Sequence, residues 1–343
     1  MVTKWYEKRG SDENIIISTR VRLARNLKDY PFPAKMTEKQ KEEVITKVRK
    51  AAINLEKEFD FIELTDVDKY TKRKMVEKHV ITRRLTEDDA TGSAVLVKTD
   101  EEISIMINED DHIRIQVICP GDSVDEAYKI AQETDAILEK HLEYAFHDKY
   151  GYLTASPGNT GTGLKASYMV HIPILELIGQ IKEISSALHK LGMQIKGMYG
   201  DRVDSFGSMY YICNQYTMGK KEEAIIDELK DIKNKIINQE IKMRSEILDA
   251  DSLEFEDKIY KSYANLKYSR IMNPLEAMIL LSDVKLGFET GILKEPKLKE
   301  NIYKIMLMMG PSRLQEMEGR KLTLKERDIK RATYIREQFG KEE

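Results

Sequence analysis

The chain has 343 residues, of which 41% are hydrophobic and 34% are charged, and its formal net charge is −3. The near-neutral charge argues against a general nucleic-acid-binding protein, and no apolar run approaches the roughly 18 residues of a membrane span, so we expect neither nucleic acid nor a membrane as a direct partner. Two cysteines, Cys119 and Cys213, exclude a disulfide framework, and the N-terminus lacks the apolar stretch of a signal peptide, so we expect a cytoplasmic protein.

The first element is a basic, extended segment at 18–25, Ser-Thr-Arg-Val-Arg-Leu-Ala-Arg. Arg20 and Arg22 lie two residues apart, so both side chains point to one face of an extended strand and suit a polyphosphate. Taken alone, such arginines would equally suit the edge of a sheet, where charged side chains simply contact water.

Helix and strand patterns then follow in turn. The capping box Thr-Glu-Lys-Gln at 37–40, with apolar residues at helical spacing as far as Phe59, predicts a helix of about five turns. Ser-Val-Asp-Glu at 123–126 predicts a second capped helix, and a third is expected at about 173–190. Six antiparallel strands are predicted at 94–97, 103–107, 113–117, about 164–172, about 193–199 and about 208–214.

Beyond residue 218 the strand pattern disappears, and apolar residues recur at three and four between 225 and 237. This pattern predicts a helix that continues to about Leu248. Three further signals of helix ends follow: an N-cap with proline at Asn273-Pro274, a stop at Gly310-Pro311 and a capping box at 323–326.

The helix that begins at Asn273-Pro274 is expected to run through about Leu286 and to be closed by Gly287 or Gly291. We therefore predict an α+β fold with two domains. An antiparallel sheet flanked by helices fills 1–240, and a smaller all-helical domain fills 241–343.

A short acidic run between two predicted strands is the most informative stretch. Residues 108–114 read Asn-Glu-Asp-Asp-His-Ile-Arg, with three consecutive carboxylates beside a histidine and an arginine. Carboxylates are costly to place between half-buried strands unless chemistry uses them. The amides of the Gly-rich loop in 153–165 could line an anion site, although such a loop alone would more often be a plain turn. The Asp-containing loop at 200–207, taken alone, would be an ordinary turn about half the time.

In this order, the segments 18–25, 108–114, 153–165 and 200–207 resemble the catalytic signature of the phosphagen (guanidino) kinases, the family of creatine and arginine kinases. The resemblance extends over nearly the whole chain, from about 14 to 336. It implies that ATP is the phosphoryl donor, with Mg²⁺ held by the phosphates and water and with no protein ligand to the metal.

The resemblance also assigns roles to individual residues. Asp110 and Asp204 take the places of two catalytic glutamates that clamp and deprotonate the acceptor guanidinium, and Glu109 and Asp201 are reserve carboxylates. The implied nucleotide-binding residues are Ser18, Thr19, Arg20, Val21, Arg22, His79, Arg114, Lys165, Ala166, Ser167, Tyr168, Met169, Tyr199, Gly200, Asp201, Arg202, Val203 and Asp204. His79 and His112, considered alone, would be ordinary structural histidines.

Four positions depart from the family pattern. Asp110 and Asp204 are each one methylene shorter than glutamate, and a misplacement of about 1 Å costs on the order of a hundredfold in rate. Ser156 stands where the family usually has cysteine and provides no thiolate, and Lys165 replaces the planar fork of an arginine with a point charge.

The branch of the family follows from two further features. Metabolite-using members carry a helical domain before the Ser-x-Arg-x-Arg motif, whereas here the motif begins at Ser18, which favours the bacterial protein-arginine kinases. The segment 327–332, Arg-Asp-Ile-Lys-Arg-Ala, resembles that branch's motif for an allosteric phosphoarginine pocket. It implies a site made by Arg327, Asp328, Arg331 and Ala332.

The expected function is therefore ATP-dependent phosphorylation of arginine side chains in proteins. The resemblance further implies stress-response protein quality control, with a Clp-type ATPase and protease, a heat-shock repressor and a zinc-binding activator protein as partners, and the long amphipathic helices suit a homodimer. A catalytically weak protein that only binds phosphoarginine is the main alternative, and a kinase of free arginine or creatine is a third.

Overall fold

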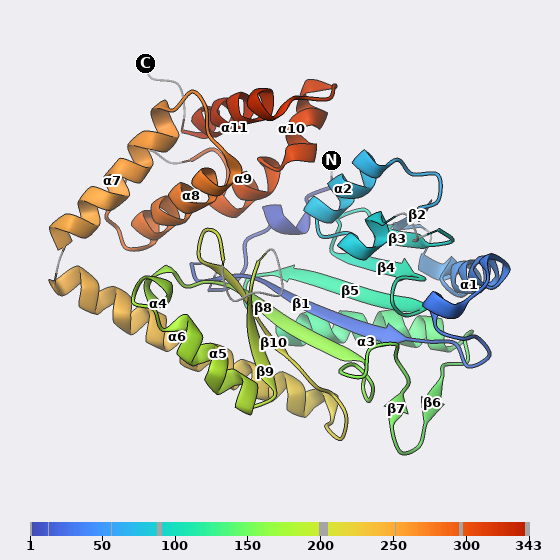
Figure 1. The fold of residues 1–343 in the computed structure, drawn as a ribbon. Coiled ribbons are helices and arrows are strands. Elements are labelled where there is room, and N and C mark those ends of the chain that lie inside the picture. Colours follow the sequence, from blue (N-terminus) through green and yellow to red (C-terminus); the bar gives the residue numbers. More distant parts are fainter. Residues whose placement is uncertain are drawn as a thin grey trace.

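The computed structural model describes residues 2–12, 14–55, 57–87, 91–198, 205–250, 252–294 and 298–339. An antiparallel sheet of eight strands, in the order β2-β3-β4-β5-β1-β8-β10-β9, forms its centre (Figure 1). The strands are β1 (Ile16–Arg25), β2 (Phe59–Glu63), β3 (Ala94–Lys98), β4 (Ile103–Ile107), β5 (Ile113–Pro120), β8 (Leu164–His171), β9 (Met193–Gly197) and β10 (Met209–Asn214). A separate hairpin pairs β6 (Phe146–His147) with β7 (Gly151–Tyr152).

Helices cover the sheet and form the C-terminal part of the chain. The α-helices are α1 (Glu38–Ala51), α2 (Lys69–Glu77), α3 (Val124–Glu139), α4 (Pro173–Leu177), α5 (Ile181–Lys190), α6 (Glu222–Ala250), α7 (Ser252–Tyr268), α8 (Pro274–Glu289), α9 (Ile302–Met308), α10 (Pro311–Glu318) and α11 (Leu324–Gln338). Short 3₁₀ helices lie at Trp5–Glu7, Pro33–Lys35, Ile53–Leu55 and Arg83–Thr86. The predicted α+β class is confirmed. No helix in the described ranges is long and apolar enough to cross a membrane.

The two faces of the central strands have opposite character. On β1, Val21 and Leu23 are buried in the main core, which α1, α3 and α6 complete on the same side of the sheet. Arg20 and Arg22 alternate with them and therefore lie on the other face. The alternation of side chains along the strand thus separates a hydrophobic layer from a cationic one.

The C-terminal helices have a core of their own, which includes Leu281, Ile305 and Ile335. Ile118 and Met169, at the ends of β5 and β8, belong to the same cluster, so these helices pack against one end of the sheet (Figure 1). Helix α6 runs without a break through residues 240 and 241. The division of the chain at that point stays a prediction.

Several predicted helix ends are confirmed. Thr37 with Gln40 and Thr323 with Glu326 form complete capping boxes, and the side chain of Asn273 accepts the amide of Glu276 at the start of α8. Gly291, at φ +76°, follows the end of α8 and closes it, because glycine adopts this left-handed conformation without strain. The alternative stop, Gly287, lies inside the helix.

Three local predictions were wrong in detail. Helix α1 ends at Ala51, because Phe59 begins β2 and pairs with Lys98 of β3. The helix expected at 173–190 divides into α4 and α5 around Gly179, whose φ of +75° is incompatible with a continuous helix. Ser123 precedes α3, but its hydroxyl donates to the carbonyl of Pro120 and does not cap the helix.

Candidate functional site

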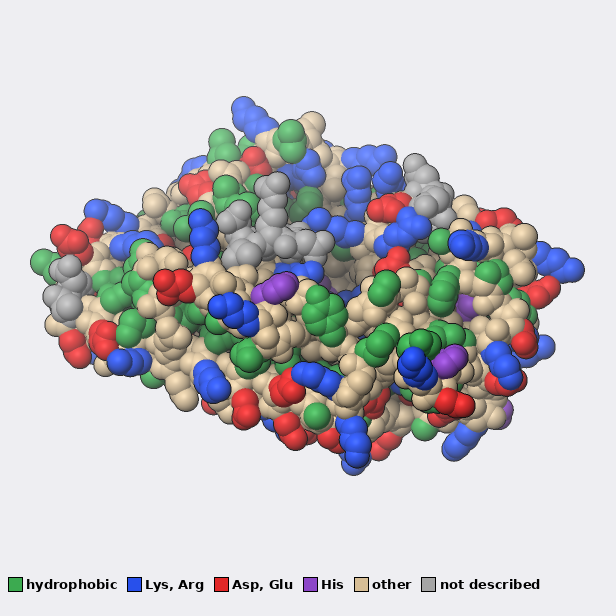
Figure 2. Space-filling view, turned by 60° about the horizontal axis from the view of Figure 1, so that its bottom comes forward, with side chains coloured by type: hydrophobic (Ala, Val, Ile, Leu, Met, Phe, Trp, Pro, Cys, Tyr) green, Lys and Arg blue, Asp and Glu red, His purple; other side chains and the backbone are tan. Residues whose placement is uncertain are grey.

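Four cationic side chains gather on the open face of the central strands. In the strand register, Arg22 of β1 lies opposite Lys165 of β8 on one side and Gln116 of β5 on the other, and Arg114 lies opposite Ala24. Paired residues of antiparallel strands share a face, so Arg20, Arg22, Arg114 and Lys165 form one cluster. Figure 2 shows the molecule hollowed near its middle, with Lys and Arg side chains gathered around the hollow.

The electrostatics of this cationic cluster are unfavourable without an anion. Burial, followed by the charges of Arg114 and Arg20, lowers the pKa of Arg22 well below its ordinary value. Burial, with Arg22 among the nearby cations, lowers the pKa of Lys165 to about 8. The Nε atoms of Arg20 and Arg22 are buried and have no hydrogen-bond partner in the described part of the chain. These donors and charges suit a polyphosphate.

Strand β10 supplies two supporting side chains that the sequence reasoning missed. The guanidinium of Arg20 lies over the ring of Tyr211, 4.4 Å from its centroid. Asn214 receives the Nζ donor of Lys165 on its backbone carbonyl, and its side chain bonds to the amide of Ala166 and the carbonyl of Leu164. Only the strand register reveals these contacts, because β10 is distant from β1 in the sequence.

Glu109 is the anchored carboxylate of the acidic run. It is 5% exposed, pairs with Arg114 at 2.5 Å and accepts the hydroxyl of Thr82 at 2.5 Å and the amide of Asp110 at 2.9 Å. Burial alone would raise the pKa of Glu109. The charge of Arg114 and these hydrogen bonds outweigh burial, so the pKa lies below its ordinary value. Glu109 therefore remains ionised and holds the guanidinium of Arg114 in place.

Asp110 has the opposite environment. Its side chain is 55% exposed, and its nearest ion pair is a long one, 3.9 Å from Oδ1 to Nε of Arg84. Partial burial of the Asp110 carboxylate and the negative charge of Glu109 raise the pKa of Asp110. An accessible carboxylate with a raised pKa is suited to accept a proton from a bound substrate.

The next two residues of the run hold the structure together. Asp111 is 4% exposed, and its Oδ1 accepts the side-chain amide of Asn26 and the backbone amide of Ala155, both at 2.7 Å. His112 is completely buried between the amide of Leu27 and the carbonyl of Pro31, and burial lowers its pKa to about 4. His112 is thus a neutral structural histidine.

The Gly-rich loop between β7 and β8 is tied to this acidic turn through the Asp111 bond to Ala155. Its far end is held by the hydroxyl of Thr217, which donates to the carbonyls of Asn159 and Thr160. Gly163, at φ +70°, passes so close to Ala24 that a Cβ atom would lie 2.5 Å from the carbonyl oxygen of Ala24. Ser156, the residue in place of the family's cysteine, is exposed in this loop.

His79 lies at the end of α2 with φ +61°. Its carbonyl accepts the side chain of Gln116, and its Nε2 lies 3.3 Å from the hydroxyl of Tyr303 in α9. Burial and the charge of Arg20 lower the pKa of His79 to about 3. His79 is therefore a neutral residue that lies between the cationic cluster and the C-terminal helices.

The remaining nucleotide-binding assignments divide between the two faces of the strands. Alternation along the strands places four of these residues on the core face: Thr19, Val21, Ala166 and Tyr168. The hydroxyl of Thr19 also donates to the carbonyl of Gly121. The same alternation places three others on the cationic face: Ser18, Ser167 and Met169. Of these, Ser18 and Met169 lie towards the C-terminal helices. Whether these residues contact nucleotide stays a prediction.

The second predicted carboxylate loop lies outside the described residues, which stop at 198 and resume at 205. This applies to Tyr199, Gly200, Asp201, Arg202, Val203 and Asp204. On its described side, the hydroxyl of Ser205 donates to the carbonyl of Met209, and Gly207, at φ +74°, lies against the backbone of Met278 in α8. Within the described ranges, no group of three or more His, Cys, Asp or Glu is placed to hold a metal ion.

The C-terminal motif is folded on itself. Arg331 is 1% exposed, and its guanidinium donates to the carbonyls of Met272 and Met309 and to the carboxylate of Asp328. Asp328 thus meets an arginine of its own helix. Ala332 is buried, and Arg327 lies one turn before Arg331 and is partly exposed.

Comparison with known proteins covers both parts of the chain. Residues 40–243 match the family described as ATP:guanido phosphotransferase, C-terminal catalytic domain, and residues 252–343 match the family described as Protein-arginine kinase McsB C-terminal domain. The chain is 38% identical over 336 residues to the protein-arginine kinase of Caldanaerobacter subterraneus subsp. tengcongensis, which covers 97% of this chain and 99% of that protein. It is 41% identical over 329 residues to that of Clostridium kluyveri, with 95% of each chain covered.

Comparison with solved structures finds kinases with a similar fold. The duplicated taurocyamine kinase from Schistosoma mansoni, with bound transition state analogue components, is 27% identical, with a TM-score of 0.61 over 72% of this chain and 37% of that one. Lombricine kinase, at 23% identity and a TM-score of 0.60, covers 72% of this chain and 70% of its own and shares the fold. The chain therefore belongs to the ATP:guanido phosphotransferase family, and its likeness along nearly its full length places it among the protein-arginine kinases.

Proposed function

We propose that this chain transfers the γ-phosphoryl group of ATP to the guanidinium of arginine side chains in proteins. The cationic cluster carries the proposal, because Arg20, Arg22, Arg114 and Lys165 lie on one face of neighbouring strands, and two of their buried donors have no partner among the described residues. Phosphoryl transfer needs mainly positive charge around the phosphate oxygens and alignment of the attacking atom. The names of the relatives support a protein arginine as the acceptor.

The chemistry assigns different tasks to the two described carboxylates. An arginine nitrogen has no free lone pair while the guanidinium is protonated, so it attacks only as a carboxylate takes its proton. The new bond joins that nitrogen to the γ-phosphorus, the bond from the γ-phosphorus to the bridging oxygen of ADP breaks, and the proton passes to Asp110 or Asp204. Glu109 holds Arg114 against the phosphates through their 2.5 Å ion pair.

The C-terminal motif is proposed as a second, allosteric site for phosphoarginine. Arg327 and Arg331 lie four residues apart on α11, so both can approach one phosphate. In the present arrangement the carboxylate of Asp328 accepts a hydrogen bond from Arg331. On binding, the guanidinium of the ligand would replace that of Arg331 at this carboxylate. Substitution Arg327→Ala should abolish any activation by free phosphoarginine and leave basal turnover unchanged.

The cellular role proposed for the chain follows its family. It would mark proteins for a Clp-type ATPase and protease and act on a heat-shock repressor, together with a zinc-binding activator protein, in stress-response quality control in the cytoplasm. Mg²⁺ would arrive with ATP and be held by phosphates and water. A homodimer is proposed because the long amphipathic helices suit one.

The deciding experiment incubates an arginine-rich protein with this chain, ATP and magnesium and analyses it by mass spectrometry under non-acidic handling. Phosphoarginine at substrate arginines would support the proposal and the use of aspartate at positions 110 and 204. If ATP binds but no phosphoarginine forms with an activator protein present, the chain is instead a phosphoarginine-binding regulator. Turnover of free arginine alone would favour the small-guanidine alternative.

A further inference from the structure

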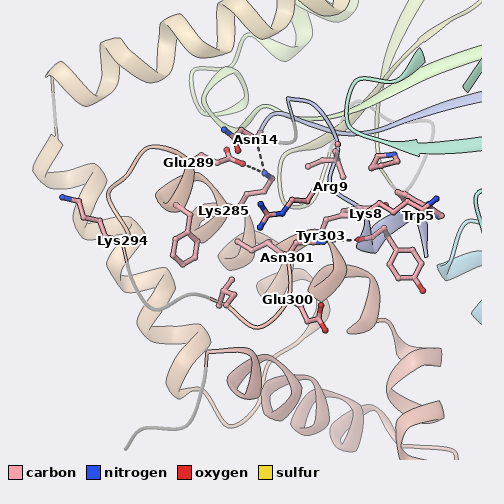
Figure 3. A pocket seen from close by; sticks show the side chains of 17 residues that line it. Trp5, Lys8, Arg9, Asn14, Lys285, Glu289, Lys294, Glu300, Asn301 and Tyr303 are labelled. Atoms are coloured by element: carbon pink, nitrogen blue, oxygen red, sulfur yellow. Dashed lines mark hydrogen bonds and ion pairs between the residues drawn. The ribbon is translucent and has the colours of Figure 1, made fainter. Parts of the chain in front are cut away.

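A cavity of about 470 Å³ lies between the N-terminal segment and the C-terminal helices. Its walls come from residues 5, 6, 8–10, 14 and 17, from Pro120 at the end of β5, from α8 and α9, and from residues 294, 298, 300 and 301 (Figure 3). None of the residues that line it belongs to the cationic cluster or to the 327–332 motif. The cavity is therefore distinct from both sites described above.

One part of the cavity is aromatic. Trp5 is 1% exposed and packs against Tyr6 and Tyr303, with ring centroids 5.6 and 5.9 Å apart. Phe288 and Ile302 add apolar surface to the lining. The indole Nε1 of Trp5 is buried and has no hydrogen-bond partner in the described residues. A flat aromatic ring would pack against these side chains.

The other part of the cavity carries net positive charge. Lys285 is 8% exposed and bonds to Glu289 and to the carbonyl of Asn14. Lys8 is paired with Asp100 and Glu102, and Glu300 with Lys304. Arg9 is exposed, and no ion pair links it to a residue in the described ranges.

Two of the lining cations, Arg9 and Lys294, make no ion pair with a residue in the described ranges. In the view of Figure 3, the guanidinium of Arg9 extends from the N-terminal segment towards Lys285 and Asn301, whereas Lys294 points away. Guanidinium groups bind carboxylate, sulfonate or phosphate oxygens through paired N–H donors.

We propose that this cavity binds a small organic anion that carries an aromatic ring. The anionic group lies at Arg9, beside Lys285, and the ring lies against Trp5, Phe288 and Tyr303. Tyr303 also contacts His79 at 3.3 Å, so one wall of the cavity reaches the edge of the cationic cluster. The proposal concerns binding alone and does not depend on the proposed kinase function.

The test uses the full chain with saturating ATP and magnesium, so that the nucleotide site is filled. Trp5 is the only tryptophan of the sequence, so its fluorescence reports this cavity directly. The probe is anilinonaphthalene sulfonate, and phenylnaphthylamine is the neutral control with the same rings. We expect saturable energy transfer from Trp5 to the sulfonate, and about tenfold weaker binding of the neutral compound.

Two charge-matched variants locate the anionic group. Arg9→Gln should weaken sulfonate binding about tenfold and leave binding of the neutral compound unchanged, because only the charge-assisted hydrogen bond is lost. Arg73→Gln removes another exposed arginine, in α2 and outside the cavity, and should change neither affinity. The proposal is overturned by the absence of saturable transfer up to millimolar probe, by equal affinities for the two compounds, or by equal effects of the two variants.

Discussion

Glu109 and Asp110 are neighbouring carboxylates with opposite environments. Glu109 is buried and bonded to Arg114, Thr82 and the amide of Asp110, whereas the side chain of Asp110 is 55% exposed. A buried, fully bonded carboxylate contributes to folding, and an exposed one with few partners contributes little. The two residues should therefore differ in whether stability or turnover depends on them.

Substitution of each by its amide separates these roles. Glu109→Gln should lower the free energy of unfolding by about 2–4 kcal/mol, because it breaks a buried ion pair. Asp110→Asn should change it by less than about 0.5 kcal/mol but lower the rate of phosphoryl transfer about a hundredfold, because proton acceptance is lost. Chemical unfolding and single-turnover assays measure the two effects. A fully active Asp110→Asn variant would remove Asp110 from the mechanism.

Lys165 gives the cationic cluster a pH dependence. Its pKa is lowered from 10.5 to about 8, first by burial and then by cations that include Arg22. Because the folded pKa lies below the unfolded one, the charged form costs stability up to about pH 8, and this cost disappears as the pH rises from about 8 towards 10.5. Over the same range the free protein loses a positive charge that ATP would need.

We therefore expect the KM for ATP to rise above about pH 8, by up to about tenfold per pH unit. Lys165→Arg, which restores the family's residue, should keep the KM flat to pH values near 10, because arginine stays charged. Initial-rate measurements across this pH range decide the matter. Identical pH profiles for the two proteins would show that Lys165 does not bind the phosphates.

At the scale of elements, the acidic turn between β4 and β5 positions the Gly-rich loop. Oδ1 of Asp111 accepts the amide of Ala155 in the loop and the side chain of Asn26 after β1, and both bonds are 2.7 Å long. The turn thus connects three segments that are far apart in the sequence. Its own shape depends on Asn108, which has φ +58° and donates to the carbonyls of Lys41 and Gly92.

Two substitutions at Asp111 test this connection. Asp111→Asn keeps an acceptor oxygen for both donors and should leave the KM for ATP within about threefold of the natural value, whereas Asp111→Ala should raise it about tenfold or more because the loop loses its anchor. Steady-state kinetics with varied ATP measures both. Similar KM values for the alanine variant and the natural chain would show that the loop is positioned by other contacts.

On the scale of the whole molecule, the catalytic sheet and the C-terminal helices are joined by specific polar contacts. The carboxylate of Glu77, at the end of α2, accepts the amides of Ser312 and Arg313 in the first turn of α10, at 3.0 to 3.2 Å. A carboxylate at this place satisfies amides that the helix leaves unbonded and complements its dipole. The same two helices also share an exposed ion pair, Lys74 with Glu316 at 2.9 Å.

Glu77→Ala should therefore lower the free energy of unfolding by about 1–2 kcal/mol, the usual loss for a helix cap. Lys74→Ala is the matched control on the same interface and should cost less than about 0.5 kcal/mol, because exposed ion pairs contribute little. Urea unfolding of the full chain measures both. A loss for Lys74→Ala as large as that for Glu77→Ala would contradict the assignment of the stabilising contact to Glu77.

Much of the fold and part of the site follow from the sequence by local physics. Alternating side chains predicted the strands, capping residues predicted the starts of α1, α8 and α11, and the spacing of Arg20 and Arg22 predicted their shared face, because each of these signals acts between near neighbours in the chain. The sequence also indicated that the carboxylates in 108–114 have a function, because carboxylates between half-buried strands cost stability.

Only the tertiary structure determines which charged side chains contact one another. It separated the buried, anchored Glu109 from the exposed Asp110, although the two are adjacent and alike in sequence. It also placed Tyr211 beneath Arg20, tied Asp111 to Ala155, and closed α1 at Ala51 in favour of β2. Strand register and burial depend on contacts between distant segments, and they set the pKa and partner of each group, so the pattern of residue types along the chain does not contain them.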